Sequence, residues 1–484
     1  MHRCRPSAKF AALAGALALV LLLSHACRDD QRPTAPLRGN AALAADAEVG
    51  QWSPVYSSPI VQLHLHLLPD GTTLSWGLLG YPQVWDPATG AFTAVPSPAL
   101  LYCAGHNFLP DGRLLVAGGH ISDDHGLPDA NLFDAATGSW QVGPHMARGR
   151  WYPTNTTLPD GEMLTIAGRD ESGAVVTIPE VWDGSGWRRL TTASLALPYY
   201  PRTFVAPDGR VFYAGEEQQS RYLDVTGTGS WTDGPVRQLG ARDYGSAVMY
   251  EPGKILYVGG GDPPTNTAEV IDLNDADPAW RYTGSMAYAR RHLNATILPT
   301  GDVLATGGTG APGFNNSAGA VHAAELWNPT TETWTTLASN AVIRMYHSTS
   351  LLLPDGRVLH TGSGDGARAA DERNYELYSP PYLFRGARPS VTGFTPTVVE
   401  YGQTLFLETP DGADIAKVTF IRTGSVTHAF DQATRFVPLA FSQVTGGLSV
   451  TLPVSRTTAP PGPYMLFLVN ASDVPSIGRI VLLQ

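Results

Sequence analysis

The stretch Leu109-Pro110-Asp111-Gly112, followed by a short apolar run that ends in glycine at Gly119, recurs along this chain. In Pro-Asp-Gly the proline presets φ and the glycine accepts φ > 0, which is typical of a tight hairpin turn. The six other copies begin at Leu68, Leu158, Ala206, Glu251, Leu298 and Leu353. Their spacing of about forty to fifty-five residues matches a four-stranded blade. The repeat therefore predicts seven antiparallel blades.

An aromatic residue closes most of these repeats. The closing residues are Phe92, Trp140, Trp187, Trp231, Trp280 and Trp334. This is the kelch pattern, and blades arranged around an axis leave only short, protected strand edges. Gly 51 and Pro 39, with only 15% charged residues, also favour many short strands joined by turns. We expect an all-β protein with a seven-bladed kelch-type β-propeller over residues 50–385.

The repeat stops near Pro389, after a proline-marked linker. Beyond it, apolar and polar residues alternate in three short segments, 404–407, 418–421 and 448–452. This alternation predicts a small β-sandwich of immunoglobulin-like type over residues 386–484.

The amino-terminal residues have the pattern of a targeting segment. Three basic residues precede an apolar run from Phe10 to Leu23, which is too short for an ordinary membrane span. We expect a signal peptide over 1–27, a flexible tether over 28–49, and export to the periplasm, the cell surface or the medium. Cleavage before Cys27 with lipidation, which would attach the chain to a membrane, and simple cleavage both remain open.

Charge and cysteine content limit the classes of partner. The net charge of -11, without a Lys/Arg block, argues against nucleic acid, which needs a clustered basic face. Cys4 and Cys27 lie in or at the edge of the targeting segment, so Cys103 is the sole thiol of the folded body. Such a cysteine is either buried and inert or chemically employed. We expect a monomer that acts on a small molecule.

The turn motif also sets a register for the residue eight places before its Asp, or before the residue standing for it. These seven residues are Gln62, Cys103, Tyr152, Tyr200, Tyr244, His292 and His347. If the strand that leads into the turn is innermost, they gather near the axis at one mouth of the propeller. Packing alone does not explain six Tyr, His or Cys, because apolar residues cost less to desolvate.

Imidazole, phenolate and thiolate groups suit copper or iron better than calcium or magnesium. Tyr346 adds a further phenol beside His347. For Tyr200, Tyr244 and His292 the alternative is that they line a polar mouth. His64 and His66 form a His-x-His pair that is either a metal site or part of an ordinary strand.

In these motifs the chain resembles the copper radical oxidases, which include galactose oxidase and glyoxal oxidase. The resemblance covers nearly everything after the tether. It rests on the segments 102–105, 150–152, 344–348, 351–358, 427–428 and 461–467, which occur in the expected order. The segment Arg150-Trp151-Tyr152 is more similar to glyoxal oxidase than to galactose oxidase.

The resemblance implies one copper ion, with Tyr152, His347 and His428 as ligands in its plane and Tyr346 as the axial phenol. It also implies a thioether bond between Cys103 and Tyr152, whose radical is the second electron acceptor. The implied reaction oxidises an aldehyde or primary alcohol, including a carbohydrate, and reduces O2 to H2O2. Tyr346 would be the general base.

Two positions bear on the substrate. Asp170 aligns nearest the tryptophan that stacks over the cross-linked ring in galactose oxidase, which makes galactose doubtful and favours small aldehydes or primary alcohols. Arg290 aligns with the sugar-contacting arginine of the family, although an ordinary surface arginine is an equal alternative.

Two other functions compete with that of a copper radical oxidase. A non-catalytic kelch propeller that binds glycans or protein partners at the cell surface is the first, since fold does not fix function. It gives no reason for Cys103, Tyr152, Tyr346, His347 and His428 to occur together. The second is a hydrolase or lyase, but the sequence has neither a zincin helix motif nor a nucleophile elbow.

Overall fold

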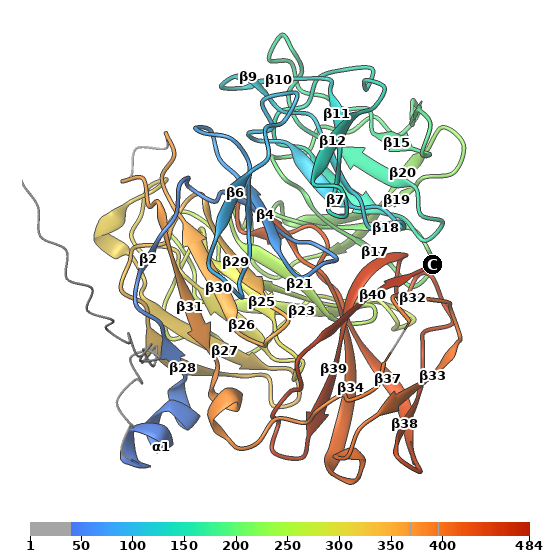
Figure 1. The fold of residues 1–484 in the computed structure, drawn as a ribbon. Helices are drawn as coiled ribbons and strands as arrows, with labels where there is room; N and C mark the ends of the chain where they lie inside the picture. The colour runs from blue at the N-terminus through green and yellow to red at the C-terminus, as the bar shows by residue number, and fades with distance from the viewer. Residues whose placement is uncertain (1–39, 367–369, 395) are drawn as a thin grey trace, which may run out of the picture. The chain divides into compact units, whose positions relative to one another are not determined.

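A computed structural model describes residues 40–366, 370–394 and 396–484 (Figure 1). The predicted signal peptide, Cys27 and most of the predicted tether lie outside the described residues. Helix α1 (Asn40–Val49) occupies the last part of the segment expected to be a tether. Its alanine-rich sequence explains the difference, because alanine is the best helix former. Residues 41–484 form one compact unit.

Seven blades make up the propeller, as the repeat predicts. Blades 1 to 3 comprise β3 (His64–Leu67), β4 (Thr73–Trp76), β5 (Gln83–Trp85) and β6 (Phe92–Ala94); β7 (Gly105–Phe108), β8 (Leu114–Ala117), β11 (Ala130–Asp134) and β12 (Ser139–Val142); and β13 (Thr154–Thr157), β14 (Met163–Ile166), β15 (Glu180–Trp182) and β16 (Trp187–Arg189). Blades 4 to 6 comprise β17 (Arg202–Val205), β18 (Val211–Gly215), β19 (Gln219–Asp224) and β20 (Ser230–Val236); β21 (Ser246–Glu251), β22 (Lys254–Val258), β23 (Ala268–Asp272) and β24 (Arg281–Tyr282); and β25 (Asn294–Ile297), β26 (Val303–Thr306), β27 (Ala323–Asn328) and β28 (Thr333–Ser339).

Blade 7 is closed by the amino-terminal strand, a feature that the repeat does not reveal. Its own strands are β29 (Ser348–Leu352), β30 (Val358–Gly362) and β31 (Asn374–Ser379). The fourth strand is β1 (Gln51–Trp52), which pairs with β31, and β2 (Tyr56–Ser57) pairs with β31 as well. The start and the end of the propeller sequence are thus held in one sheet.

The predicted turns have the expected geometry. The Gly112 amide donates to the Leu109 carbonyl at 3.0 Å, and Gly112 has φ 87°. The Leu109 amide in turn donates to the Arg113 carbonyl at 2.8 Å, which makes a type I turn followed by a glycine bulge. Each such turn joins the innermost strand of a blade to the second strand, so the register argument places its residues at the axis.

The carboxy-terminal segment folds into a seven-stranded arrangement with its own core. Its strands are β32 (Val398–Val399), β33 (Thr404–Glu408), β34 (Ile415–Arg422), β37 (Phe436–Val444), β38 (Gly447–Thr451), β39 (Gly462–Asn470) and β40 (Arg479–Leu483). Strand β37 pairs with β34 through its first half and with β38 through its second half, so it joins two sheets. Buried side chains such as Phe420, Leu448 and Leu466 pack between them. The boundary at 385/386 stays a prediction.

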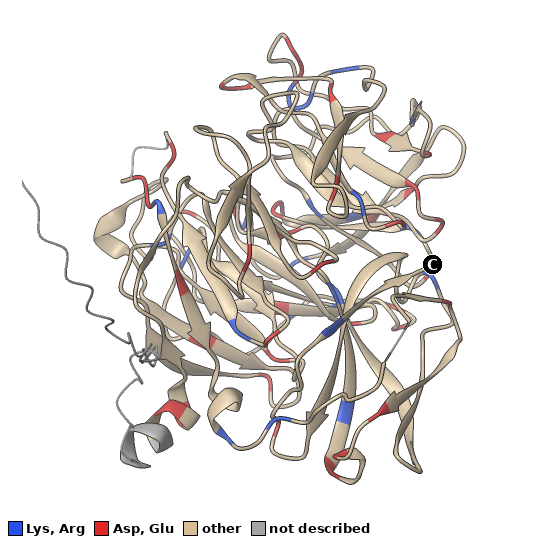
Figure 2. Cartoon of the chain, in the orientation of Figure 1, with Lys and Arg blue, Asp and Glu red and all other residues tan. Residues whose placement is uncertain are grey.

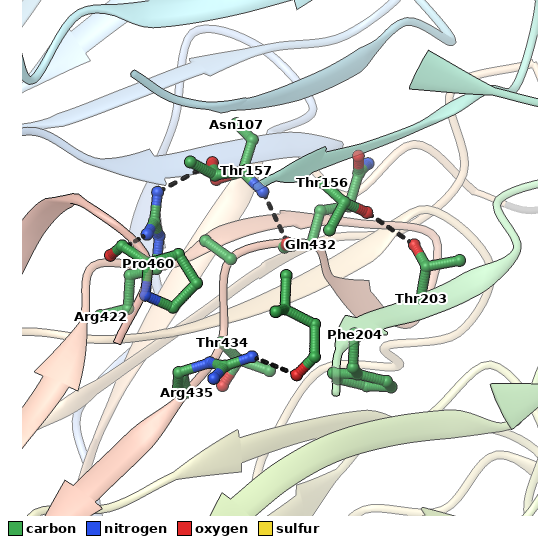
Figure 3. A pocket seen from close by; sticks show the side chains of 12 residues that line it. Asn107, Thr156, Thr157, Thr203, Phe204, Arg422, Gln432, Thr434, Arg435 and Pro460 are labelled. Atoms are coloured by element: carbon green, nitrogen blue, oxygen red, sulfur yellow. Dashed lines mark hydrogen bonds between the residues drawn. The ribbon is translucent and has the colours of Figure 1, made fainter. Parts of the chain in front are cut away.

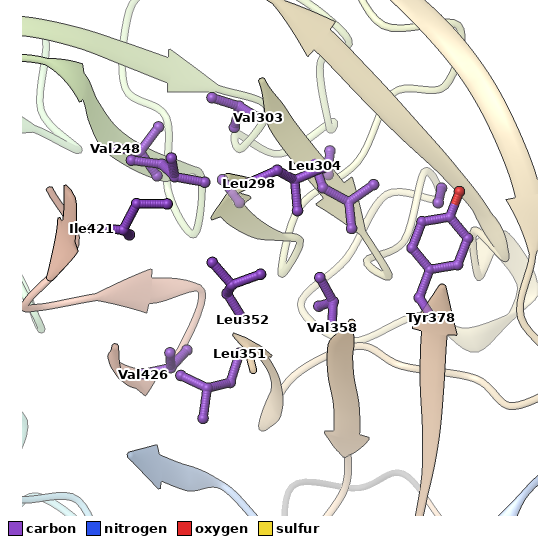
Figure 4. Packing of buried hydrophobic residues seen from close by; sticks show 14 of the residues in the cluster. Val248, Leu298, Val303, Leu304, Leu351, Leu352, Val358, Tyr378, Ile421 and Val426 are labelled. Carbon is purple, nitrogen blue, oxygen red and sulfur yellow. The ribbon is translucent and has the colours of Figure 1, made fainter. Parts of the chain in front are cut away.

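A hairpin from this segment enters the propeller. Strand β35 (Ser425–Thr427) pairs with β3 of blade 1, and β36 (Phe430–Asp431) pairs with β35. Ile421 and Val426 belong to the same buried cluster as Leu351 and Leu352 of blade 7 (Figure 4). The apolar core of the propeller is therefore continuous with the carboxy-terminal strands.

Charged residues are spread over many strands and loops of the described chain (Figure 2). Among the described residues, no helix is long and apolar enough to span a membrane.

Candidate active site

Six of the seven residues singled out by the repeat register share one unusual backbone conformation. Their φ angles are positive: Cys103 61°, Tyr152 66°, Tyr200 45°, Tyr244 52°, His292 59° and His347 69°. Left-handed φ is uncommon for residues other than glycine, Asn and Asp, so a shared value marks equivalent structural positions. Each of the six lies one or two residues before an innermost strand. The expected ring at the mouth of the propeller is therefore present, and Gln62 is its exception.

Two phenols meet at the centre of this ring. The hydroxyls of Tyr152 and Tyr346 are 2.5 Å apart, although the residues belong to blades 3 and 7. Burial raises the pKa of both phenols well above the usual value, so both keep their protons at neutral pH in the metal-free protein. Short contacts between two buried hydroxyls are typical of groups that converge on a common partner.

Two imidazoles face the same point with one nitrogen unpaired. The Nδ1 atom of His347 bonds to the Gly364 carbonyl at 2.6 Å, and Nδ1 of His428 bonds to Thr427 Oγ1 at 2.7 Å. The Nε2 atoms of both rings are buried and have no hydrogen-bond partner. Their ring centroids are 4.7 Å apart with the planes at 80°. An imidazole held at one nitrogen and unpaired at the other is the arrangement of a metal ligand.

The protonation state of these rings suits a metal as well. Burial lowers the pKa of His347 to about 3 and that of His428 well below its usual value. Both imidazoles are therefore neutral at physiological pH, as ligation requires. The ring of His428 lies 4.5 Å from that of Tyr152, and the ring of Tyr346 stacks on His347 at 3.8 Å.

His428 reaches the ring from the carboxy-terminal hairpin. It lies in the two-residue turn between β35 and β36, where His428 has φ 45° and Ala429 has φ 65°. Two successive left-handed residues define the type I′ turn, whose twist suits a tight hairpin. The turn thus aims an imidazole from a distant part of the sequence at the propeller axis.

Cys103 is fully buried beside Tyr152. Its thiol interacts with the side chains of Tyr152 and Tyr102, and the Tyr152 amide donates to the Cys103 carbonyl at 2.8 Å. Burial raises the pKa of the thiol well above its usual value. It is the free cysteine of the described chain, and its position next to a phenol is what a thioether bond between the two would need.

Trp151 covers the ring of Tyr152. The two ring centroids are 3.8 Å apart with planes at 14°, and the Trp151 Nε1–H donates to His120 Nδ1 at 3.0 Å. Tyr199 packs edge-on against Trp151 at 5.3 Å. Sequence reasoning missed this stack, because a residue adjacent in sequence to Tyr152 gives no signal of lying on its face.

An open cavity of about 720 Å³ leads to these groups. Tyr152, Tyr346 and His347 form part of its wall, together with Tyr102, Trp151 and Phe314. The lining combines aromatic side chains with polar groups such as Asp123 and Asn316, as in small-molecule sites. A small molecule can therefore reach the two phenols.

Two family models and several known proteins are similar to this chain. Residues 388–483 match the family model described as "Galactose oxidase-like, Early set domain", and residues 260–382 match "Glyoxal oxidase N-terminus". Galactose oxidase of Gibberella zeae is 28% identical over 487 residues, which cover 90% of this chain and 70% of that protein. Aldehyde oxidase GLOX of Vitis pseudoreticulata is 29% identical over 444 residues, which cover 78% and 81%.

The chain is thus similar to galactose oxidases and glyoxal oxidases over most of its length. A solved fungal alcohol oxidase "in complex with copper" shares the fold, with a TM-score of 0.83 and 24% identity, and the match covers 90% of this chain and 100% of that one. This likeness supports the seven-bladed architecture and the carboxy-terminal β-sheet domain.

Two substrate predictions made from this family need correction. The Asp170 carboxylate is engaged within its own turn, where it accepts bonds from Ser172 and Ala174. The ring of Tyr152 is stacked by Trp151, so the alignment of Asp170 with a stacking position no longer argues against galactose. Arg290 is fully buried and pairs with Glu325 between strands, so it does not contact a substrate in the cavity.

The remaining ring members have other partners. The Tyr200 hydroxyl donates to the Ala104 carbonyl at 3.1 Å, and His292 Nε2 bonds to the Phe314 carbonyl at 2.5 Å. These contacts agree with the alternative that they line the mouth. His64 and His66 are buried on β3, and His64 Nδ1 bonds to His106 Nε2 at 2.9 Å. His66 Nδ1 bonds to the Leu74 carbonyl and its Nε2 has no hydrogen-bond partner, so both alternatives for the His-x-His pair stay predictions.

Proposed function

We propose that this chain is a copper radical oxidase that oxidises an aldehyde or a primary alcohol by two electrons and reduces O2 to H2O2. The observation that carries the proposal is the convergence of two unpaired imidazole nitrogens and two phenols beside a buried thiol. His347, His428, Tyr152 and Tyr346 would hold the copper ion. Neutral imidazole and phenolate are ligands that suit Cu(II).

The residues of the chain divide the chemistry between them. Bound copper would accept one electron and polarise the substrate oxygen as a Lewis acid. Tyr152 accepts the second electron together with a hydrogen nucleus from the substrate carbon, since its ring would carry the radical. Tyr346, whose oxygen is 2.5 Å from that of Tyr152, takes the proton of a hydroxyl of the alcohol or of the hydrated aldehyde as general base. O2 then takes up the two electrons and two protons and leaves as H2O2.

The cavity argues for a substrate with a small polar head. Tyr102, Trp151 and Phe314 offer aromatic faces to the body of the substrate near the two phenols. Because Trp151 covers Tyr152, the lack of a stacking residue no longer disfavours a carbohydrate alcohol. We keep aldehydes and primary alcohols as the substrate class, with carbohydrates among them.

Export, monomeric state and the absence of a nucleic-acid partner belong to the same proposal. The residues that would carry the signal peptide and a lipid at Cys27 lie outside the described part of the chain. Support for export therefore comes from the amino-terminal sequence pattern.

The test is a substrate screen of copper-loaded protein with peroxide detection. We expect turnover of at least one small aldehyde or primary alcohol, with one copper per chain by elemental analysis. His347→Ala and His428→Ala should each lower copper occupancy sharply, because each removes an imidazole with an unpaired nitrogen. Full occupancy in both variants would contradict the ligand assignment.

Cys103→Ser separates the radical from the metal. It removes the thioether without removing a proposed ligand, so copper should stay bound while peroxide production falls to nearly zero. Peptide mass spectrometry of the wild type should show residues 103 and 152 in one joined peptide, lighter by two hydrogens. Two unmodified peptides in active, copper-loaded protein would refute the radical mechanism.

A further inference from the structure

A belt of backbone hydrogen bonds links several positions of the ring. The Tyr152 amide donates to the Cys103 carbonyl at 2.8 Å, and the Tyr200 amide donates to the Tyr152 carbonyl at 3.0 Å. Between blades 5 and 6, the His292 amide donates to the Tyr244 carbonyl at 2.9 Å. At each of these positions, the backbone carbonyl of the equivalent residue in the preceding blade accepts from the amide of the left-handed residue and holds it in place.

Cys103 differs from these three positions because its amide is held by a side chain, as is the amide of Tyr244, which donates to Glu216 Oε2 at 3.3 Å. The Cys103 N–H donates to His64 Nε2 at 3.0 Å. The equivalent residue one blade earlier is Gln62, whose φ is not in the left-handed range shared by the others. The imidazole of His64 thus takes the place of the backbone carbonyl that accepts from the amides of Tyr152, Tyr200 and His292. His64 and Cys103 are both fully buried.

The tautomer of His64 follows from this bond. Because an amide can only donate, His64 Nε2 must accept, so Nδ1 carries the ring proton and donates to His106 Nε2 at 2.9 Å. The remaining proton of His106, on Nδ1, goes to Ser425 Oγ at 2.7 Å, and the Ser425 hydroxyl donates to the His106 carbonyl at 3.1 Å. This chain of bonds orients the acceptor from behind and ends on the hairpin that carries His428.

We propose that His64 is a positioning residue that aims the Cys103 thiol at Tyr152 for formation of the thioether bond. The inference rests on the proposed function. A left-handed Cys103 is strained and persists only where its surroundings hold it. Loss of its one amide partner would leave a buried N–H unpaired and release the backbone that directs the thiol.

The bond in question forms between Cys103 Sγ and a Cε ring carbon of Tyr152, ortho to the hydroxyl. The S–H and that C–H bond are lost, which releases two protons and two electrons. O2 is the oxidant that the proposed activity already uses, and it takes up both to become H2O2. His64 takes no part in this exchange and fixes only the geometry.

Two isosteric variants separate the two bonds of His64. In His64→Gln the side-chain oxygen lies where Nε2 was and can still accept from the Cys103 amide. In His64→Asn the side-chain nitrogen lies where Nδ1 was and can still donate to His106, but the Cys103 amide loses its acceptor. Both changes remove one ring nitrogen, so they disturb packing to a similar extent.

The measurement follows cross-linking after copper and O2 are added to copper-free protein. Samples are denatured, alkylated and analysed by peptide mass spectrometry, which reports the joined and free forms over time. We expect the Gln variant to react within about twofold of the wild-type rate, and the Asn variant at least about tenfold more slowly, since an unpaired buried N–H is costly. Copper occupancy should be the same in both.

His66→Asn is the matched control. His66 lies two residues away on the same strand, is equally buried, and bonds to the Leu74 carbonyl without touching Cys103. It should cross-link at the wild-type rate, and all rates are read below the melting temperature of the least stable variant. Equal rates for the Gln and Asn variants, fast or slow, would overturn the role of His64. A wild-type protein that binds copper but never cross-links would instead overturn the proposed function.

Discussion

At the scale of single residues, the backbone conformation determines which side chains meet at the site. Six side chains reach the axis because each belongs to a residue with left-handed φ that lies just before an innermost strand. Such a conformation costs about 1 kcal/mol or more for a residue with a Cβ, so the surroundings must hold it. The belt of amide bonds supplies that restraint at Tyr152, Tyr200 and His292, and the side chains of His64 and Glu216 supply it at Cys103 and Tyr244. Side chains held in this way converge without a flexible loop.

The stack of Trp151 on Tyr152 is open to a direct test at the same scale. Trp151→Phe keeps an aromatic ring but reduces the covering face and removes the N–H bond to His120. We expect kcat to fall about threefold to tenfold, since aromatic contacts of this kind are worth about 0.5–1.5 kcal/mol. The radical absorption band should also decay faster, while copper occupancy stays unchanged.

Trp140→Phe serves as the control for that experiment. Trp140 closes blade 2 and donates to the Val95 carbonyl at 2.9 Å, away from the cavity. It should keep wild-type kcat and radical lifetime. If both variants behave alike, the stack has no part in sustaining the radical.

Residue-level prediction from the sequence succeeds and fails for identifiable reasons. Cys103, Tyr152 and His347 are found by register, because a repeat converts position in sequence into position around the axis. The sequence does not identify Trp151 as the stacking residue and suggests the Asp170 position instead. A stacking partner is determined by its position in three dimensions, which a sequence pattern does not give. Any nearby strand or loop can supply the covering ring.

At the scale of elements, each of several blades contains a buried arginine paired with a glutamate on its third strand. The pairs are Arg150–Glu180, Arg242–Glu269, Arg290–Glu325 and Arg344–Glu376. The glutamates also accept amide bonds from Ala147, Gln238, Ala287 and Ala341. Each pair therefore ties the segment that carries a ring residue to the sheet behind it.

Arg290 tests this structural role. Arg290→Met leaves Glu325 buried without its cation, so the free energy of unfolding should fall by about 3–5 kcal/mol. KM for any substrate should stay within about twofold, because Arg290 is bonded inside its blade. Chemical denaturation and steady-state kinetics measure the two effects.

The comparison is with Arg281→Met. Arg281 pairs with Glu332 at 2.5 Å on the surface, and its side chain is 59% exposed. Loss of such a pair should cost about 1 kcal/mol or less. A large rise in KM for Arg290→Met without loss of stability would restore the substrate role that the sequence suggested.

The blades themselves were predictable, because turn, strand and closing aromatic repeat in fixed order. The strand that completes blade 7 was not, since β1 is only Gln51–Trp52 and lies about three hundred residues from its partner β31. Two residues carry no periodicity that a pattern could detect. The Trp52 Nε1–H bond to the Ala338 carbonyl at 2.8 Å helps to hold this strand in place.

At the scale of the whole molecule, burial of neutral histidines makes stability depend on pH. Burial lowers the pKa of His66 and His360 to about 3. The same holds for His292 and His347, and the pKa values of His64, His106 and His428 are also well below 6.5. Below pH 6.5 the unfolded chain binds protons that the folded chain does not. Stability should therefore fall as pH drops from about 6.5 toward 3.

Buried carboxyls oppose this trend in part. Burial raises the pKa of Glu216 to about 7 and those of Asp365 and Asp431 to about 6. These groups bind protons in the folded state first, so on their own they would favour folding at lower pH. The histidines outnumber them, and the net direction is loss of stability in acid. Denaturation midpoints of copper-free protein at pH 7.5, 6 and 5 should decrease in that order.

His360→Gln makes this pH dependence specific. His360 is buried, so its replacement should flatten the profile by up to one proton. A profile that is flat between pH 7.5 and 5 in the wild type would contradict the argument.

Delivery of His428 depends on how the carboxy-terminal strands dock into the propeller. Arg422 Nη2 donates to the Phe108 carbonyl at 3.0 Å and to Thr157 Oγ1 at 2.9 Å, and Nη1 donates to two carbonyls of the segment 460–461. Figure 3 shows Arg422 and Arg435 beside Gln432 around a cavity of about 20 Å³. That volume holds about one water molecule. A single guanidinium therefore ties blades 2 and 3 to the strand that leads to the hairpin.

Arg422→Met should show that this docking governs the metal site at a distance. The change removes four buried hydrogen bonds, although the Phe108 carbonyl keeps Thr157 Oγ1 and the Pro460 carbonyl keeps the Tyr464 hydroxyl as donors, so the free energy of unfolding should fall by about 1–3 kcal/mol. Copper affinity should fall as well, because the β35–β36 hairpin that positions His428 loses its anchor, although no proposed ligand is altered. Arg456→Met, on an exposed residue that lies over the Tyr401 ring at 4.4 Å, should change neither quantity. Calorimetric copper titration and denaturation of both variants make the comparison. Wild-type copper affinity in Arg422→Met would mean that the pairing of β35 with β3 places His428 without help from the hydrogen bonds of Arg422.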